Sequence, residues 1–212
     1  MEEILSDLST RDVKAQKVEG LAREVLGKTY VTFQTKQFFL DEDFDGGHAK
    51  VRANLRQHTG EQTTDMDIEG QGVGLVDALF DGMLKSFARE YSSLSSIAIV
   101  DFNIHIKVKN SYGRRSDAMA IAMLTIRNSE DNEYAFSHST PSVSQSSVAV
   151  VQDAVKFFVN SERAYIQLYV ALEDAKKRGR FDLVERYQNQ MSTLVQATSY
   201  RKIVEQMTAD KK

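Results

Sequence analysis

Cysteine is absent from this chain of 212 residues, and proline occurs only once. Without cysteine the chain has no disulfide, no thiolate nucleophile and no zinc–thiolate site, which fits a reducing compartment. No apolar run approaches the roughly 20 residues that a membrane-spanning helix needs, and the acidic residues 1–3 do not resemble the start of a signal peptide. We therefore expect a cytoplasmic protein with no membrane partner and no long disordered linker.

The chain also lacks an excess of positive charge. Its 27 Lys and Arg residues are outnumbered by 30 Asp and Glu residues, which gives a formal net charge of -3. A strongly basic surface is the usual electrostatic sign of nucleic-acid binding, so we expect no nucleic-acid partner. The hydrophobic content of 42% is enough to build a packed core.

The chain does have one series of predicted elements, three strands followed by a helix, that occurs twice. Residues 30–39, 49–55 and 64–68 show the β-branched or alternating composition of strands, and a glycine-rich turn follows. An amphipathic helix comes next, with apolar side chains at Val76, Leu79, Phe80, Met83, Leu84 and Phe87. This order predicts an antiparallel βββα unit over residues 29–92.

The same order returns with an offset of about 70 residues, which is longer than the repeats of solenoid proteins. Residues 100–108, 117–127 and 133–138 are predicted strands, and a helix is predicted from about residue 145. These elements form a second unit over residues 96–160. Residues 1–28 are predicted to form an N-terminal helical arm. Residues 161–212 are predicted to form a C-terminal helical extension with a break at residues 178–180.

The predicted fold class is therefore α+β. Two βββα units, an internal repeat, form antiparallel sheets with packed helices over residues 29–160. The N-terminal helix and a C-terminal helical hairpin flank them. Because the terminal helices lie outside the repeat, we expect them to wrap the sheets or a neighbouring molecule.

Three alternate glycines, Gly70, Gly72 and Gly74, lead into the first predicted helix. Glycine is used where the backbone takes positive φ or where another group must come close to it. The helix start behind the turn offers unpaired N–H groups and the positive end of the helix dipole, so the turn could hold a carboxylate or a phosphate. The alternative is a tight strand-to-helix turn without a ligand.

Cofactor motifs built on such turns do not fit this sequence. A dinucleotide-binding turn needs Gly-x-Gly-x-x-Gly after a buried strand, whereas Leu75 stands where the third glycine after Gly70 and Gly72 belongs. The strand before the turn also carries acidic residues. A Walker loop is excluded because the turn has no Gly-Lys-Ser/Thr. We expect no cofactor.

Metal and catalytic patterns are also missing. The histidines show no metal-ligand spacing on one element, at His48, His58, His105 and His138. In Ser137-His138-Ser139 the hydroxyls fall on the opposite face of a strand from the ring, and no buried acid is apparent to orient that histidine. The acidic residues 41–43 and 65–67 look solvated. We predict no metal site and no catalytic residue, and an enzyme with an unrecognised site stays as an alternative.

With two units and a glycine turn, the pattern resembles the C-terminal regulatory, leucine-sensing domain of 2-isopropylmalate synthase and its citramalate synthase relatives. That family opens its first helix with Gly-x-Gly-Pro-Val-Asp-Ala, and this chain has Gly72-Val73-Gly74-Leu75-Val76-Asp77-Ala78. The middle strand of the family's second unit often begins with Thr-Asp-Ala, and Ser116-Asp117-Ala118 is similar. Residues 142–151 stand where the family has a Gly-Val-Ser-like loop and the start of its second helix.

The resemblance implies a homodimer whose loops enclose a small amino acid, leucine-like or isoleucine-like, or a keto acid. The ligand-binding residues that it implies are Gly72, Gly74, Leu75, Val76, Asp77, Ala78, Asp117, Ala118, Ser144 and Ser146. Catalysis in that family needs a (β/α)₈ barrel of about 250 residues and a His-x-His metal motif, and this chain has neither. It is therefore expected to be a non-catalytic stand-alone relative, or a piece of a larger protein, that works with an acyltransferase subunit.

The same comparison supports an alternative. Leu75 replaces the family proline, and Val150-Val151 replace Ala-Ser. These bulkier side chains would fill the effector pocket. The chain would then be a structural protein-interaction module that acts on a catalytic subunit in trans.

Overall fold

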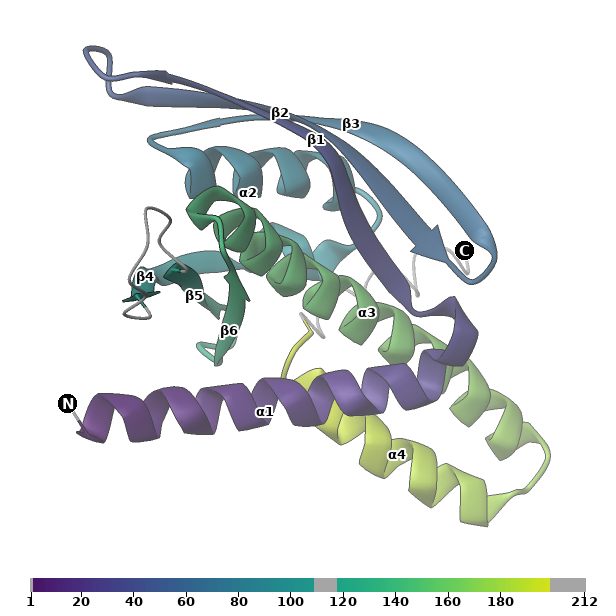
Figure 1. Ribbon diagram of the computed structural model, residues 1–212. Coiled ribbons are helices and arrows are strands. Elements are labelled where there is room, and N and C mark those ends of the chain that lie inside the picture. The colour runs from purple at the N-terminus through teal and green to yellow at the C-terminus, as the bar shows by residue number, and fades with distance from the viewer. Residues whose placement is uncertain (1, 109–117, 199–212) are drawn as a thin grey trace.

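The structure is a computed structural model that describes residues 2–108 and 118–198, with side chains from Val13 onward. Within these residues it contains two three-stranded antiparallel sheets and four α-helices, in the order of the predicted repeat. The first sheet lies above α2 and α3 in Figure 1, and the second sheet lies below them. The predicted α+β fold with two βββα units is confirmed.

The first sheet is a meander of β1 (Val31–Asp43), β2 (His48–Thr59) and β3 (Gln62–Gly72), with β2 in the centre. Alternate residues of β2 are buried, namely Ala49, Val51, Ala53 and Leu55. The residues between them face solvent with their charges, as the alternating sequence predicts. A register shift between Thr35 and Gln37 marks a bulge in β1.

Helix α2 (Leu75–Phe87) follows β3 directly and packs back onto β3 and β2. Its buried side is apolar and lies on the same face of the sheet as the buried residues of β2, with Met83 and Ala78 fully enclosed. The short 3-10 helix η2 (Ser92–Ser96) then leads into the second unit.

The second sheet has the same topology, with β4 (Ala98–Val108), β5 (Ala118–Arg127) and β6 (Glu133–Thr140) and β5 in the centre. Helix α3 (Val143–Lys177) packs on β5 and β6. The core between them is aromatic: Tyr134 lies 4.9 Å from Phe157 and 5.9 Å from Phe158, measured between ring centroids.

Two buried polar residues of α3 join the two units. The Asn160 amide accepts from the backbone N–H of Val31 at 2.8 Å and donates to the Val31 carbonyl at 2.9 Å. The Glu162 carboxylate accepts from the backbone N–H groups of Ser92, at 3.1 Å, and Ser93, at 2.8 Å. Both side chains are 1% exposed, so these bonds hold the start of β1 and the start of η2 against the same helix.

The two helices that lie outside the repeat form a layer of their own, packed against α3. Helix α1 (Glu2–Leu26) ends in the 3-10 turn η1 (Gly27–Thr29), and α4 (Phe181–Val195) runs back along α3 after the break at Gly179. Both helices contact α3. Helix α3 is continuous across residue 160, where the second unit was predicted to end. No helix in residues 2–108 and 118–198 is long and apolar enough to span a membrane.

Candidate functional site

The glycine turn brings the backbone of α2 directly onto β3. A Cβ atom on Gly70 would overlap the carbonyl oxygen of Ala78 and lie 2.5 Å from the backbone nitrogen of Gly82. A Cβ on Gly72 would lie 2.5 Å from the backbone nitrogen of Ala78. Real Cβ atoms do not come this close, so Gly70 and Gly72 are required by the contact between helix and strand.

Gly74 is different because its surroundings are open. It is the N-cap residue of α2, with an extended backbone at φ -168°, which any residue adopts. The nearest atom to an added Cβ is Glu42 Oε1, at 4.0 Å. The Gly74 carbonyl accepts the first helical bond, from the N–H of Ala78 at 3.0 Å.

The predicted ligand-binding residues of this first motif have different environments. Val76 and Ala78 are buried between α2 and the sheet, at 9% and 0% exposure. Leu75 is half-buried, and the Asp77 side chain is exposed. Of these residues, Gly72, Gly74, Leu75 and Asp77 therefore reach solvent, and their assignment to a ligand stays a prediction.

Two residues of the second predicted set, Ser144 and Ser146, lie in the first turn of α3, beside β6. Ser146 is fully buried, and its hydroxyl bonds the Ala120 carbonyl and the Thr140 N–H, each at 2.9 Å. Its polar atoms hold the first turn of α3 to the sheet. Ala118 is half-buried at the start of β5, and Asp117 lies outside the described residues.

Ser144 lines a cleft of about 540 Å³ between β1 and the start of α3. We call it the β1/α3 cleft. Its lining mixes aromatic, aliphatic, hydroxyl and amide groups, from Phe33, Gln34, Thr35, Lys36, Phe38, Thr140, Ser144, Gln145, Val148, Ala149 and Gln152. The volume falls within the roughly 300–1,000 Å³ of small-ligand pockets. The first motif, residues 72–78, is not part of this lining, so the structure does not bring the two predicted sets into one pocket.

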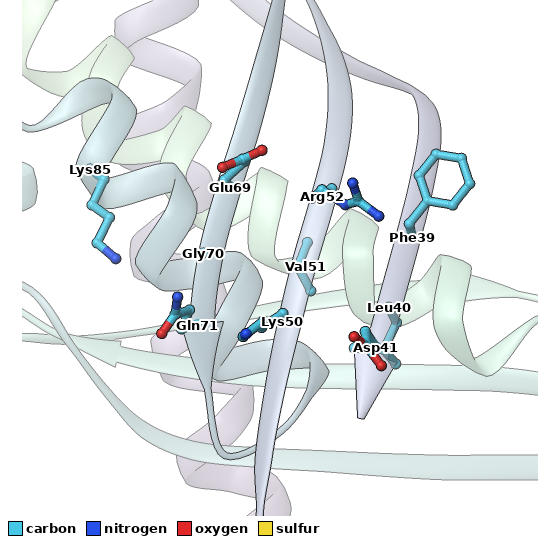
Figure 2. Close-up of a pocket in the computed structure, with 10 residues that line it drawn as sticks. All are labelled: Phe39, Leu40, Asp41, Lys50, Val51, Arg52, Glu69, Gly70, Gln71 and Lys85. Atoms are coloured by element: carbon cyan, nitrogen blue, oxygen red, sulfur yellow. The ribbon is translucent and has the colours of Figure 1, made fainter. Parts of the chain in front are cut away.

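A second hollow, of about 620 Å³, lies over the first sheet. Figure 2 shows Phe39, Arg52 and Glu69 on the three strands, with Lys85 on α2. Lys85 is held by Asp81 at 2.6 Å, and Asp81 also accepts from the backbone N–H of Gln71, at 2.9 Å. The lining carries both signs of charge, from Lys50, Arg52, Lys85, Asp41 and Glu69. This hollow therefore gives no electrostatic preference for an anion or a cation.

One pairing was missed from the sequence. His138 Nδ1 lies 2.9 Å from Asp153 Oδ2, and the other oxygen of Asp153 is 2.6 Å from the ammonium of Lys156. The sequence showed no buried acid that could orient this histidine, and the structure places a half-buried one, Asp153, beside it. Strand β6 and helix α3 bring the two residues together across 15 positions, and no local spacing signals it. Ser137 lies on the outer face of the sheet, as predicted, and forms no triad with the pair.

In the part of the chain that the structure describes, no three His, Asp or Glu side chains gather closely enough to hold a metal ion. No protein-family model matches the chain. No curated protein matches it either. The fold and these sites are therefore the basis of a functional assignment.

Proposed function

We propose that this chain is a non-catalytic regulatory and dimerisation domain, similar in role to the effector domain of 2-isopropylmalate synthase. The observation that carries the proposal is an apolar part of the second sheet that no helix of the described residues covers. Ile104 and Ile106 of β4 pair with Ala122 and Ala120, which are buried beneath α3. The two isoleucines lie on the same face but are 37% and 59% exposed.

The corresponding strand of the first unit, β1, is partly covered by a helix. Helix α3, from the second unit, packs on β1 as well as on its own sheet. Among the described residues, neither α2 nor α3 makes an extensive contact with β4. An apolar strip that the helices of its own chain leave exposed is the kind of surface that a second copy of the chain buries.

The homodimer is tested by light scattering at micromolar concentration. We expect a dimer for the unmodified chain and a monomer for Ile106→Asp, because a carboxylate in an apolar interface is costly to desolvate. Val170→Asp is the matched control, since Val170 is also a β-branched residue, 60% exposed, on the distant part of α3. A dimer that survives Ile106→Asp would refute the role of β4.

The proposed effector is a small branched-chain amino or keto acid, and the compartment is the cytoplasm of a cell that makes such acids. Ser144, at the β1/α3 cleft beside Phe38 and Val148, supports an amphipathic ligand of this size. A thermal-shift panel of leucine, isoleucine, valine, 2-oxo acids and acetyl-CoA tests it. A ligand at 100 times its Kd stabilises the folded state by about 2.7 kcal/mol, and no shift with any of them would contradict an effector role.

A second candidate function is a structural module that docks on a catalytic acyltransferase subunit without an effector. The closed contacts of Gly70 and Gly72 with α2 favour it, because they leave no space between turn and helix. It predicts a dimer with no thermal shift. The thermal-shift panel of ligands is therefore the measurement that distinguishes the two candidate functions.

A further inference from the structure

Among the residues that the structure describes, the outer edge of β1 is unpaired over most of its length. Val31 directs both its N–H and its carbonyl to Asn160, away from β2. Since backbone groups alternate in direction along a strand, Phe33 and Thr35 present theirs to the same side. Beyond the bulge, the register with β2 gives Phe38 and Leu40 that orientation. In the described chain, β1 pairs only with β2.

Helix α3 covers the Val31 end of this edge and leaves the Leu40 end open. The amide of Gln152 donates to Thr35 Oγ1 at 2.5 Å, which joins strand and helix. Toward the start of α3 the two elements separate, as Figure 1 shows, and the β1/α3 cleft lies between them. The cleft has an apolar floor of Phe33, Phe38 and Val148. An edge strand beside a helix with an apolar floor is the geometry that accepts an added strand.

A strand that enters this cleft must have alternating apolar and polar side chains. Its apolar side chains face the floor, and its polar side chains face the open side of the first sheet. Strand β4 has this pattern, with Phe102, Ile104 and Ile106 on one face and Asp101, Asn103, His105 and Lys107 on the other. Strand β4 is itself an edge strand with its outer side unpaired among the described residues.

Charge and architecture agree with this pairing. The open end of β1 carries Asp41 and Asp43 on the polar face, where they lie opposite Lys50 and His48 of β2, while the last residues of β4 carry His105 and Lys107 on theirs. Because each copy carries both strands, a twofold dimer makes the β1–β4 contact twice. Each contact would cover the exposed isoleucines of one copy with the cleft of the other.

We propose that β4 of a second copy adds to β1 as a fourth strand in the β1/α3 cleft, and that the twofold axis of the dimer relates this contact to a reciprocal one. This inference rests on the proposed homodimer and names its mode of assembly. The isoleucines of β4 then occupy the β1/α3 cleft, so this mode of assembly belongs to the second candidate function, in which the cleft holds no effector. Backbone hydrogen bonds join the two sheets into a continuous six-stranded sheet.

Cross-linking tests the pairing without ambiguity because the chain has no cysteine of its own. Leu40→Cys and Ile106→Cys chains are prepared separately, mixed to exchange subunits, and treated with a short bis-maleimide reagent, which tolerates an offset of a residue or two. We expect a product of twice the chain mass in the mixture, and little in either variant alone. A mixture of Val170→Cys and Ile106→Cys is the control and should remain uncrosslinked. Circular dichroism checks that each variant is folded.

The outcomes separate the mode of pairing from the dimer itself. A product from Leu40→Cys alone indicates β1–β1 pairing, and a product from Ile106→Cys alone indicates β4–β4 pairing. Either one overturns the inference. A dimer by light scattering that yields no product in the mixture also overturns it but leaves the proposed function standing. A monomer at all concentrations overturns both.

Discussion

Replacing Gly70 by alanine tests whether the glycine turn is shaped by packing. The added Cβ would meet the Ala78 carbonyl oxygen and lie 2.5 Å from Gly82 N and 2.8 Å from Gly82 Cα. These are backbone atoms, so they cannot rotate away, and α2 must shift from the sheet. Overpacking of a tight interior costs roughly 1–3 kcal/mol. The reduced entropy of the unfolded chain returns about 0.4–1 kcal/mol.

The net expectation for Gly70→Ala is a loss of about 1–2 kcal/mol in the free energy of unfolding. For a chain of this size, each kcal/mol corresponds to roughly 2–4 °C in Tm. Gly20→Ala is the matched control, because Gly20 lies exposed in α1 and an added Cβ meets nothing within 4 Å. There the same substitution should raise the stability by about 1 kcal/mol.

Chemical denaturation followed by circular dichroism measures both variants against the unmodified chain. The two substitutions are expected to change stability in opposite directions. Gly74→Ala, at the open N-cap position, should cost less than Gly70→Ala. If Gly70→Ala were neutral, or if its effect equalled that of Gly74→Ala, the close contact between α2 and β3 would be refuted.

Three further predictions concern buried polar groups. Asn160→Leu keeps the branched shape of the side chain but leaves the Val31 N–H and carbonyl unpaired. It should lower the free energy of unfolding, measured in a urea melt, by roughly 1–3 kcal/mol for each unpaired group; a neutral result would contradict the bonds. Glu162→Gln places a donor against the N–H groups of Ser92 and Ser93 and should lower stability by about 2–3 kcal/mol, whereas Glu173→Gln on the exposed part of α3 should change it little. Burial first, and then the bond to Glu90, raise the pKa of Tyr91 to about 12, and burial also raises the pKa of Tyr30 and Tyr134. A raised pKa in the folded state gives stability that is present below the ordinary tyrosine pKa of about 10 and is lost as pH rises toward the folded value. An absorbance titration should therefore show tyrosinate appearing with unfolding above about pH 10, and complete ionisation in a folded chain would contradict it.

The fold was predictable wherever apolar residues recur in the sequence with a clear period. In β2 the alternation of Ala49, Val51, Ala53 and Leu55 with charged residues specifies both the strand and its buried face, and the structure confirms it. The first strand was predicted over residues 30–39, but β1 continues through the acidic residues 41–43 because they pair with residues 48–50. Composition favoured a turn there, and the cross-strand pairing outweighed it.

The limits of the sequence appear where contacts join distant segments. The glycines left two interpretations open, because only the position of α2 shows what a Cβ would meet at Gly70. Asn160 and Glu162 sit on a helix whose apolar stripe gave no sign of two buried polar anchors. His138 and Asp153 meet only because β6 and α3 pack together. Helix α3 runs past residue 160 because no glycine or proline interrupts residues 143–177.

The central claim is that the uncovered strand of the second unit makes this chain a self-associating domain. Sedimentation equilibrium of the unmodified chain over a concentration series tests it most directly. We predict a species of twice the chain mass of 23.9 kDa that dissociates only on dilution. A single mass of one chain across the whole series would contradict the claim.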